Sequence, residues 1–302
     1  MTIAEAVLLG VVQGIFMFFP VSSTSHLVLV QHALIRRGSA LPNPESPEML
    51  LFDLVVHVGT LISIAVVFRR QLAGFLRSLL HELTNNGDSL PADDPARVAP
   101  LRAGRERPRY LFVKLLLLGV FVSTGVSGLL GLPIYRVAEQ VFAQPIMISV
   151  TLVITGILLY WTDVIPARKR GLAELTFAVA LAIGVAQALS LLPGLSRSGL
   201  TIVAALVVGL KRPWAAQYSF FIAFPTIIAA TGLQSVLALY GEQLGSVSIA
   251  AQFVGFVVAA VVGIFALKLV VTLLYSAKFR YFSYYVWTLA VVVAVAVSTG
   301  WL

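Results

Sequence analysis

Long apolar runs recur from the beginning of the chain to its end. Six of them are clear, and they occupy residues 49–68, 111–132, 145–162, 214–240, 248–274 and 283–302. An α-helix needs about 20 apolar residues to cross the hydrocarbon core of a bilayer. The pattern of apolar positions therefore predicts six transmembrane helices.

Two further apolar blocks, at residues 3–35 and 174–210, are each interrupted near the middle. The first contains the sequence FFPVSSTS around Pro20, and the second contains PGLSRSG, which begins at Pro193. Proline cannot donate a hydrogen bond within a helix, and it disfavours helical conformation at the residue before it. We therefore expect each block to form a helical hairpin with a break at its proline.

Hydroxyl side chains follow both prolines and predict where the helices restart. Ser22 or Ser23 is a good N-cap for the second helix of the first hairpin. Ser196 or Ser198 is an equally good N-cap in the second hairpin. Each restart leaves backbone N–H groups and the positive end of a helix dipole inside the membrane, where they must be satisfied or line a wet cavity. Such a helix N-terminus, with hydroxyls beside it, is suited to bind an anion.

The longest polar stretch, residues 69–110, is rich in arginine, and we expect it to be a cytoplasmic loop. Within it, residues 85–108 (NNGDSLPADDPARVAPLRAGRERP) have the composition of a flexible linker. Because the chain changes sides of the membrane at each span, this placement also determines on which side the ends of the other segments lie. Block 174–210 then has both ends in the cytoplasm, whereas block 3–35 has both ends outside. Arg36 and Arg37 become the one exception to the rule that basic residues face the cytoplasm.

The order of segments suggests an internal repeat. A hairpin followed by three spans occurs twice in a single membrane domain, residues 1–302, as halves 1–165 and 171–302 of opposite orientation. A weak echo between residues 10–23 (GVVQGIFMFFPVSS) and 184–198 (GVAQALSLLPGLSRS) supports this division. Inverted repeats with broken helices create polar sites near the middle of a membrane. We expect an all-α polytopic membrane protein with six transmembrane helices and two re-entrant helical hairpins in an inverted-topology repeat.

Composition agrees with this fold class. The chain has 302 residues, of which 59% are hydrophobic and 11% charged, and its mean hydropathy is +0.96. A soluble domain has about 25% charged residues. The net charge of +8 comes from basic residues between the spans, so we do not expect nucleic-acid binding. The absence of cysteine excludes disulfides, thiolate metal sites and thiol catalysis. The first residues, MTIAEAV, lack basic side chains, so a cleaved signal peptide is not expected.

Arg197 is the strongest indication of chemistry. A guanidinium at membrane depth is costly and by default functional, and its planar fork suits phosphate oxygens. If the hairpins enter from opposite faces, their tips meet, and Arg197, His26 and the hydroxyls of both breaks surround one pocket for a phosphate-bearing anion. The structural alternative is that the hydroxyls bond to their own backbone, His26 is a satisfied interior histidine and Arg197 pairs with carbonyl groups.

The paired motifs PVSSTSH and PGLSRSG resemble those of the undecaprenyl-pyrophosphate phosphatase family, also called bacitracin-resistance proteins. The resemblance covers nearly the full length, including FDLVVHVGTL at residues 52–61. It implies an enzyme of the bacterial plasma (inner) membrane whose site faces the periplasm. Such an enzyme removes the terminal phosphate of undecaprenyl (C55) pyrophosphate and regenerates the monophosphate carrier used in peptidoglycan synthesis. The implied partners are this lipid and membrane lipids, and a homodimer is left open.

The resemblance also implies roles for individual residues. Ser23 would be the nucleophile or a close phosphate ligand, His26 the general acid or base, and Arg197 the phosphate clamp. The implied substrate-binding residues are Ser22, Thr24, Ser196, Ser198 and Gln13.

Met17 departs from the family pattern. Gln13 occupies the first position of the E/Q-x-x-x-E motif, and Met17 occupies the second, on the same helix face. Two oxygen-bearing side chains there can share a metal such as Mg²⁺ or Ca²⁺, but a thioether holds neither a proton nor a hard cation. Asp53 and His57, one turn apart on the next span, can replace the missing acid only if they point inwards. Two alternatives follow: a phosphatase that works without that carboxylate, or a non-hydrolytic paralogue that transports or flips polyprenyl phosphate lipids.

Overall fold

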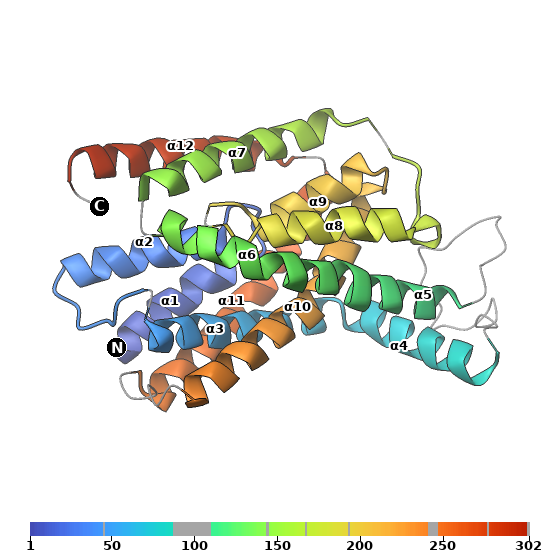
Figure 1. Ribbon diagram of the computed structural model, residues 1–302, viewed down its shortest axis with the longest axis horizontal. Coiled ribbons are helices and arrows are strands. Elements are labelled where there is room, and N and C mark those ends of the chain that lie inside the picture. The colour runs from blue at the N-terminus through green and yellow to red at the C-terminus, as the bar shows by residue number, and fades with distance from the viewer. Residues whose placement is uncertain are drawn as a thin grey trace.

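The computed structural model describes residues 1–44, 46–86, 110–142, 145–166, 168–192, 194–240, 247–276 and 278–300. All the regular elements in these ranges are helices, apart from one isolated bridge between Arg170 and Leu210 (Figure 1). The sequence-based prediction of an all-helical protein is therefore confirmed for the part of the chain that the structure describes.

Six candidate membrane spans are found among the described residues. They lie in α3 (Pro47–Val67), the continuous run of α5 (Leu111–Leu117), η2 (Leu118–Thr124) and α6 (Gly125–Phe142), α7 (Pro145–Val164), α10 (Arg212–Tyr240), α11 (Ile249–Tyr275) and α12 (Arg280–Ser298). Each is long and apolar enough to cross a bilayer, as the sequence predicts. The chain is thus a multi-pass membrane protein.

The two interrupted blocks form pairs of shorter helices. The first block gives α1 (Ile3–Phe16) and α2 (Ser23–Arg36), which are separated by the non-helical residues 17–22 around Pro20. The second block gives α8 (Phe177–Leu189) and α9 (Arg197–Val207). Pro193 lies outside the described residues, but the described residues on both sides of it are non-helical. Both interruptions are therefore where the sequence predicts them.

The prediction of a loop over residues 69–110 is wrong for its first part. A helix, α4 (Arg69–Thr84), begins directly after α3, and a short 3₁₀ helix, η3 (Leu172–Glu174), lies on the segment before α8. One face of α4 carries leucines and Phe75, which packs with edge-to-face geometry on Phe112 of α5 at 5.4 Å between ring centroids. The linker predicted over the rest of the stretch lies mostly outside the described residues.

Helices α1 and α3 both pack closely against α11 (Figure 1). A Cβ atom added to Gly14 of α1 would lie 2.9 Å from the carbonyl oxygen of Ala259. One added to Gly59 of α3 would lie 2.5 Å from the carbonyl oxygen of Phe256. Small residues let helix backbones approach this closely inside a membrane. Because Phe256 and Ala259 are one turn apart on α11, the neighbourhoods of Gly14 and Gly59 lie at nearly the same depth.

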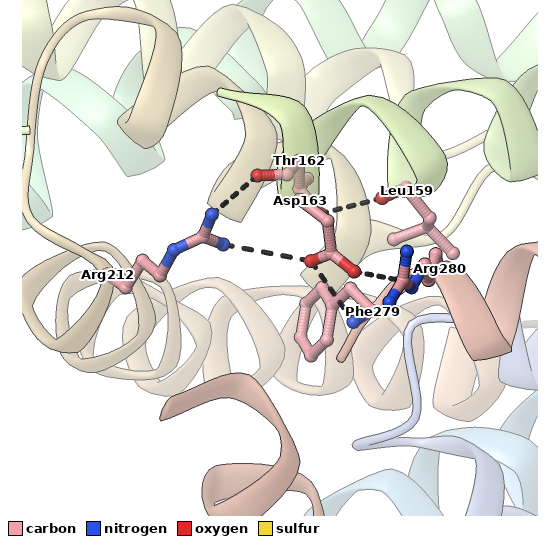
Figure 2. A network of polar contacts seen from close by, with 6 residues as sticks. All are labelled: Leu159, Thr162, Asp163, Arg212, Phe279 and Arg280. Atoms are coloured by element: carbon pink, nitrogen blue, oxygen red, sulfur yellow. Dashed lines mark hydrogen bonds and ion pairs between the residues drawn. The ribbon is translucent and has the colours of Figure 1, made fainter. Parts of the chain in front are cut away.

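Figure 2 shows that Asp163, at the end of α7, contacts residues at the starts of α10 and α12. Its carboxylate accepts hydrogen bonds from the backbone N–H groups of Phe279, at 3.2 Å, and Arg280, at 2.9 Å. The Nη1 atom of Arg212 lies 3.9 Å from Oδ1 of Asp163, and its Nη2 donates to the carbonyl of Thr162 at 2.8 Å. Asp163 therefore satisfies N–H groups that the first turn of α12 leaves free.

Candidate functional site

The first break has an unusual backbone conformation. Helix α1 ends at Phe16, and Ser22 adopts the left-handed conformation with φ 66° and ψ 86°. Ser22 is the residue before α2, but its side chain does not cap the helix and instead lies 3.1 Å from Oγ of Ser25. The predicted side-chain cap is therefore wrong, because the left-handed backbone turns the hydroxyl elsewhere. Non-glycine residues held in this region cluster at functional sites.

His26 connects the first break to α12. Its Nδ1 lies 2.7 Å from the backbone carbonyl oxygen of Ser22, which can only accept, so Nδ1 carries the proton. In the neutral ring, Nε2 then accepts a hydrogen bond from the hydroxyl of Tyr285 at 2.8 Å. The ring also stacks on Phe16 with 3.8 Å between centroids. Both nitrogens of His26 are thus engaged within the protein.

The second break is anchored on α7. The hydroxyl of Ser196 accepts a hydrogen bond from the backbone N–H of Gly199 at 3.2 Å, which confirms Ser196 as the N-cap of α9. The N–H of Ser196 donates to Oγ1 of Thr155 at 3.3 Å, and the Thr155 hydroxyl donates to the carbonyl of Gly194 at 2.7 Å. Gly194 has φ 90° and lies against Thr151, so a side chain there would be both strained and obstructed.

Arg197 joins the two breaks. Its Nη2 lies 3.5 Å from the sulfur of Met17, the first residue after α1. Both residues line a cavity of about 10 Å³, the size of a single water, to which Ser198, Thr201 and Ser219 also contribute. A guanidinium has five N–H donors, whereas thioether sulfur is a weak acceptor, and Arg197 has no other side-chain partner among the described residues. The site therefore presents cationic donors that an anion with several oxygens would satisfy.

Of the other residues predicted for the site, Ser198 lines this cavity, whereas Ser23, Thr24 and Gln13 are not among the described residues that line it. Ser23 and Thr24 occupy the first turn of α2, keep some accessible surface and form no hydrogen bond with other described side chains. Gln13 is completely buried, and neither its amide oxygen nor its amide nitrogen has a partner. Ser198 lies 3.4 Å from Ser196, oxygen to oxygen.

Four polar residues of the site were not predicted from the sequence. They are Tyr285, Thr155, Thr201 and Ser219. Tyr285 is 259 positions from His26, and no local motif signals their contact. Ser219 has a buried hydroxyl without a partner, which only the packing of α10 against the break makes visible.

The described part of the chain contains no cluster of side chains suited to hold a divalent cation. No three His, Asp or Glu side chains lie together among the described residues in a way that could hold a metal. Gln13 offers one amide oxygen and Met17 only a thioether, whereas Mg²⁺ and Ca²⁺ prefer several oxygens.

Fold and site together define a multi-pass membrane protein with an arginine and hydroxyl groups where two broken helices meet. A family model described as bacitracin resistance protein BacA matches residues 6–292, and the chain belongs to this family. The predicted family is therefore confirmed.

Relatives of similar length carry one name. A protein named undecaprenyl-diphosphatase from Halorhodospira halophila is 52% identical over 297 residues, which is 98% of this chain and 97% of the relative. One of the same name from Alkalilimnicola ehrlichii is 53% identical over 289 residues, 96% of this chain and 94% of the relative. A third, from Carboxydothermus hydrogenoformans, is 32% identical and covers 98% of both chains.

Proposed function

We infer that this chain is an undecaprenyl-diphosphatase, which hydrolyses the terminal phosphate of undecaprenyl diphosphate and returns undecaprenyl phosphate for peptidoglycan synthesis. One observation carries this inference. Arg197 lies at the junction of the two breaks, and its only side-chain partner among the described residues is the thioether of Met17. The relatives at 52% and 53% identity bear the name of this activity.

The diphosphate group lies between the two restarted helices. Arg197 binds phosphate oxygens of the substrate, assisted by the hydroxyl of Ser198 and by the N-terminus of α9, where Ser196 is the cap. Ser22 and Thr24 contribute hydroxyls from the other side, together with the positive end of the α2 dipole. Positioning and electrostatic stabilisation account for most of the catalysis of phosphoryl transfer, and these groups supply both.

Ser23, or a water molecule that it positions, attacks the terminal phosphorus. The bond from phosphorus to the bridging oxygen breaks, and its electron pair stays on the oxygen of undecaprenyl phosphate. If Ser23 is the attacking group, water then hydrolyses the phosphoserine and inorganic phosphate leaves. The prediction that His26 takes the proton requires that Tyr285 first release Nε2.

We further propose that the two broken blocks are re-entrant hairpins in an inverted repeat. Helix α1 and helix α2 have 14 residues each, and α8 and α9 have 13 and 11. At about 1.5 Å per residue none of them reaches the roughly 30 Å of a bilayer core. The distribution of basic residues supports a bacterial inner-membrane orientation in which the site opens to the periplasm.

Release of phosphate from undecaprenyl diphosphate by the purified protein in detergent tests the proposed activity. We expect turnover by the parent and a loss of about 10²-fold or more in the Ser23→Ala and Arg197→Ala variants. A parent protein that releases no more phosphate than the variant with both Ser23→Ala and Arg197→Ala would contradict hydrolysis. Protein-dependent movement of a fluorescent polyprenyl phosphate across liposomes, with no phosphate released, would instead support the transport alternative.

A further inference from the structure

The attack on phosphorus needs a group that accepts a proton, and two expected groups are unsuited to that task. Met17 holds the position of the motif acid but has no proton-accepting atom. His26 has a donor at Nδ1 bonded to Ser22 and an acceptor at Nε2 bonded to Tyr285. Neither residue has a free basic atom.

His57 on α3 does have one. Its Nδ1 lies 2.6 Å from the backbone carbonyl oxygen of Asp53, one turn earlier, so Nδ1 carries the proton. The lone pair of the neutral ring is then on Nε2, for which the described residues provide no hydrogen-bond partner. His57 is a partly buried residue.

A carboxylate lies on the same face of α3. Oδ1 of Asp53 accepts a hydrogen bond from Nε2 of Gln31 at 3.0 Å, and Gln31 is fully buried on α2. Asp53 and His57 are four residues apart, and side chains at this spacing are neighbours on a helix. The contact with Gln31 therefore orients the acidic group of α3 towards α2.

The depth of His57 matches that of the site. Gly14 and Gly59 approach backbone oxygens one turn apart on α11, which places Gln13 and His57 within about one helical turn of each other in depth. Gln13 is completely buried and its amide has no partner. His57 is also close enough to Arg197 for the two side chains to interact electrostatically. His57 thus lies near both the phosphate-binding arginine and the helix that lacks its acid.

We propose that His57, held by Asp53, accepts the proton of the attacking hydroxyl and replaces the acid that is missing at Met17. This assignment rests on the proposed hydrolytic function. As the nucleophile's oxygen bonds to phosphorus, its proton passes to Nε2 of His57, and the electrons of the breaking bond stay on the oxygen of undecaprenyl phosphate. His57 returns the proton to solvent after phosphate leaves.

The His57→Gln variant tests the proposal, because glutamine keeps the polarity but cannot accept a proton. We expect kcat for phosphate release from undecaprenyl diphosphate to fall by about 10²-fold or more, with KM little changed. The fall in rate towards acidic pH, where the parent's imidazole gains a proton, should disappear. Arg197 acts on His57 through its charge and Asp53 through its backbone carbonyl, so the arginine stays unchanged in the His57 variants. His81→Gln on α4 is the matched control and should keep parent activity.

A second variant separates chemistry from folding. Adding Met17→Glu to His57→Gln restores the motif acid. We expect kcat of this double variant to be at least tenfold higher than kcat of His57→Gln alone. A His57→Gln variant with the parent's rate and pH profile would overturn the proposal, as would a loss that Met17→Glu does not recover. A parent that releases no more phosphate than the Ser23→Ala, Arg197→Ala variant would contradict the proposed function instead.

Discussion

The contact between His26 and Tyr285 shows how single residues fix the shape of the first break. Tyr285 donates to Nε2, Ser22 accepts from Nδ1, and Phe16 stacks on the ring. A left-handed non-glycine residue such as Ser22 costs about 1–2 kcal/mol. The three contacts of His26 offset that cost, because they hold the chain on both sides of the turn. His26 therefore stabilises the conformation of the break.

Replacement of Tyr285 by phenylalanine tests this role. The Tyr285→Phe variant leaves Nε2 of His26 without its donor, and we expect the free energy of unfolding to fall by about 1–3 kcal/mol. Chemical denaturation in detergent micelles provides the measurement. Tyr284→Phe is the matched control, because its ring packs against Tyr160 and Trp287 and its hydroxyl forms no hydrogen bond with the described residues. Equal stability of the two variants would show that the hydroxyl of Tyr285 does not support the break.

At these positions, the sequence predicted correctly those features that depend only on neighbouring residues in the chain. Ser196 caps α9 as predicted, because an N-cap depends on the residue and the three that follow it. Ser22 does not cap α2, since its left-handed backbone follows from packing that one segment cannot specify. The partnership of His26 with Tyr285 could not be predicted for the same reason, as it joins α2 to α12.

At the scale of whole helices, α4 was missed because the charged residues of its segment were given more weight than the spacing of its apolar residues. The arginines at its start suggested a loop, yet Leu72, Phe75 and Leu79 recur at helical spacing and pack inwards. The carboxylate of Glu82 then accepts hydrogen bonds from the N–H groups of Phe112 and Val113, which joins α4 to the start of α5. The six long spans, in contrast, were predictable because uninterrupted apolar length is nearly sufficient for a membrane helix.

The Asp163 junction allows a test of how helix ends hold the bundle together. The Asp163→Asn variant keeps the shape but loses the negative charge that attracts Arg212 and the N–H groups of Phe279 and Arg280 (Figure 2). We expect a loss of about 1–3 kcal/mol in the free energy of unfolding, since charged hydrogen bonds contribute this much. Glu48→Gln in the first turn of α3 is the control, and an equally small effect of both would contradict the assigned role.

Across the molecule, helices from opposite halves of the chain meet at one point. α1 and α2 supply Met17 and the first break, while α9 and α10 supply Arg197 and Ser219. Both breaks and the arginine could be predicted from the motifs, whereas the contact between them is a property of the folded bundle. Asp53 and His57 were recognised in the sequence, but the orientation of Asp53 towards α2 depends on the buried Gln31.

Cross-linking of the two breaks tests this meeting most directly. The chain has no cysteine, so Met17→Cys and Ser198→Cys introduce the only thiols, and both positions line the same cavity. We expect a short bifunctional thiol reagent to join them within one chain in membranes, and undecaprenyl diphosphate to slow the reaction. Met17→Cys paired with Val291→Cys, on an exposed face of α12, is the control pair. Cross-linking no faster than in the control, or unaffected by the lipid diphosphate, would contradict a shared phosphate site between the two breaks.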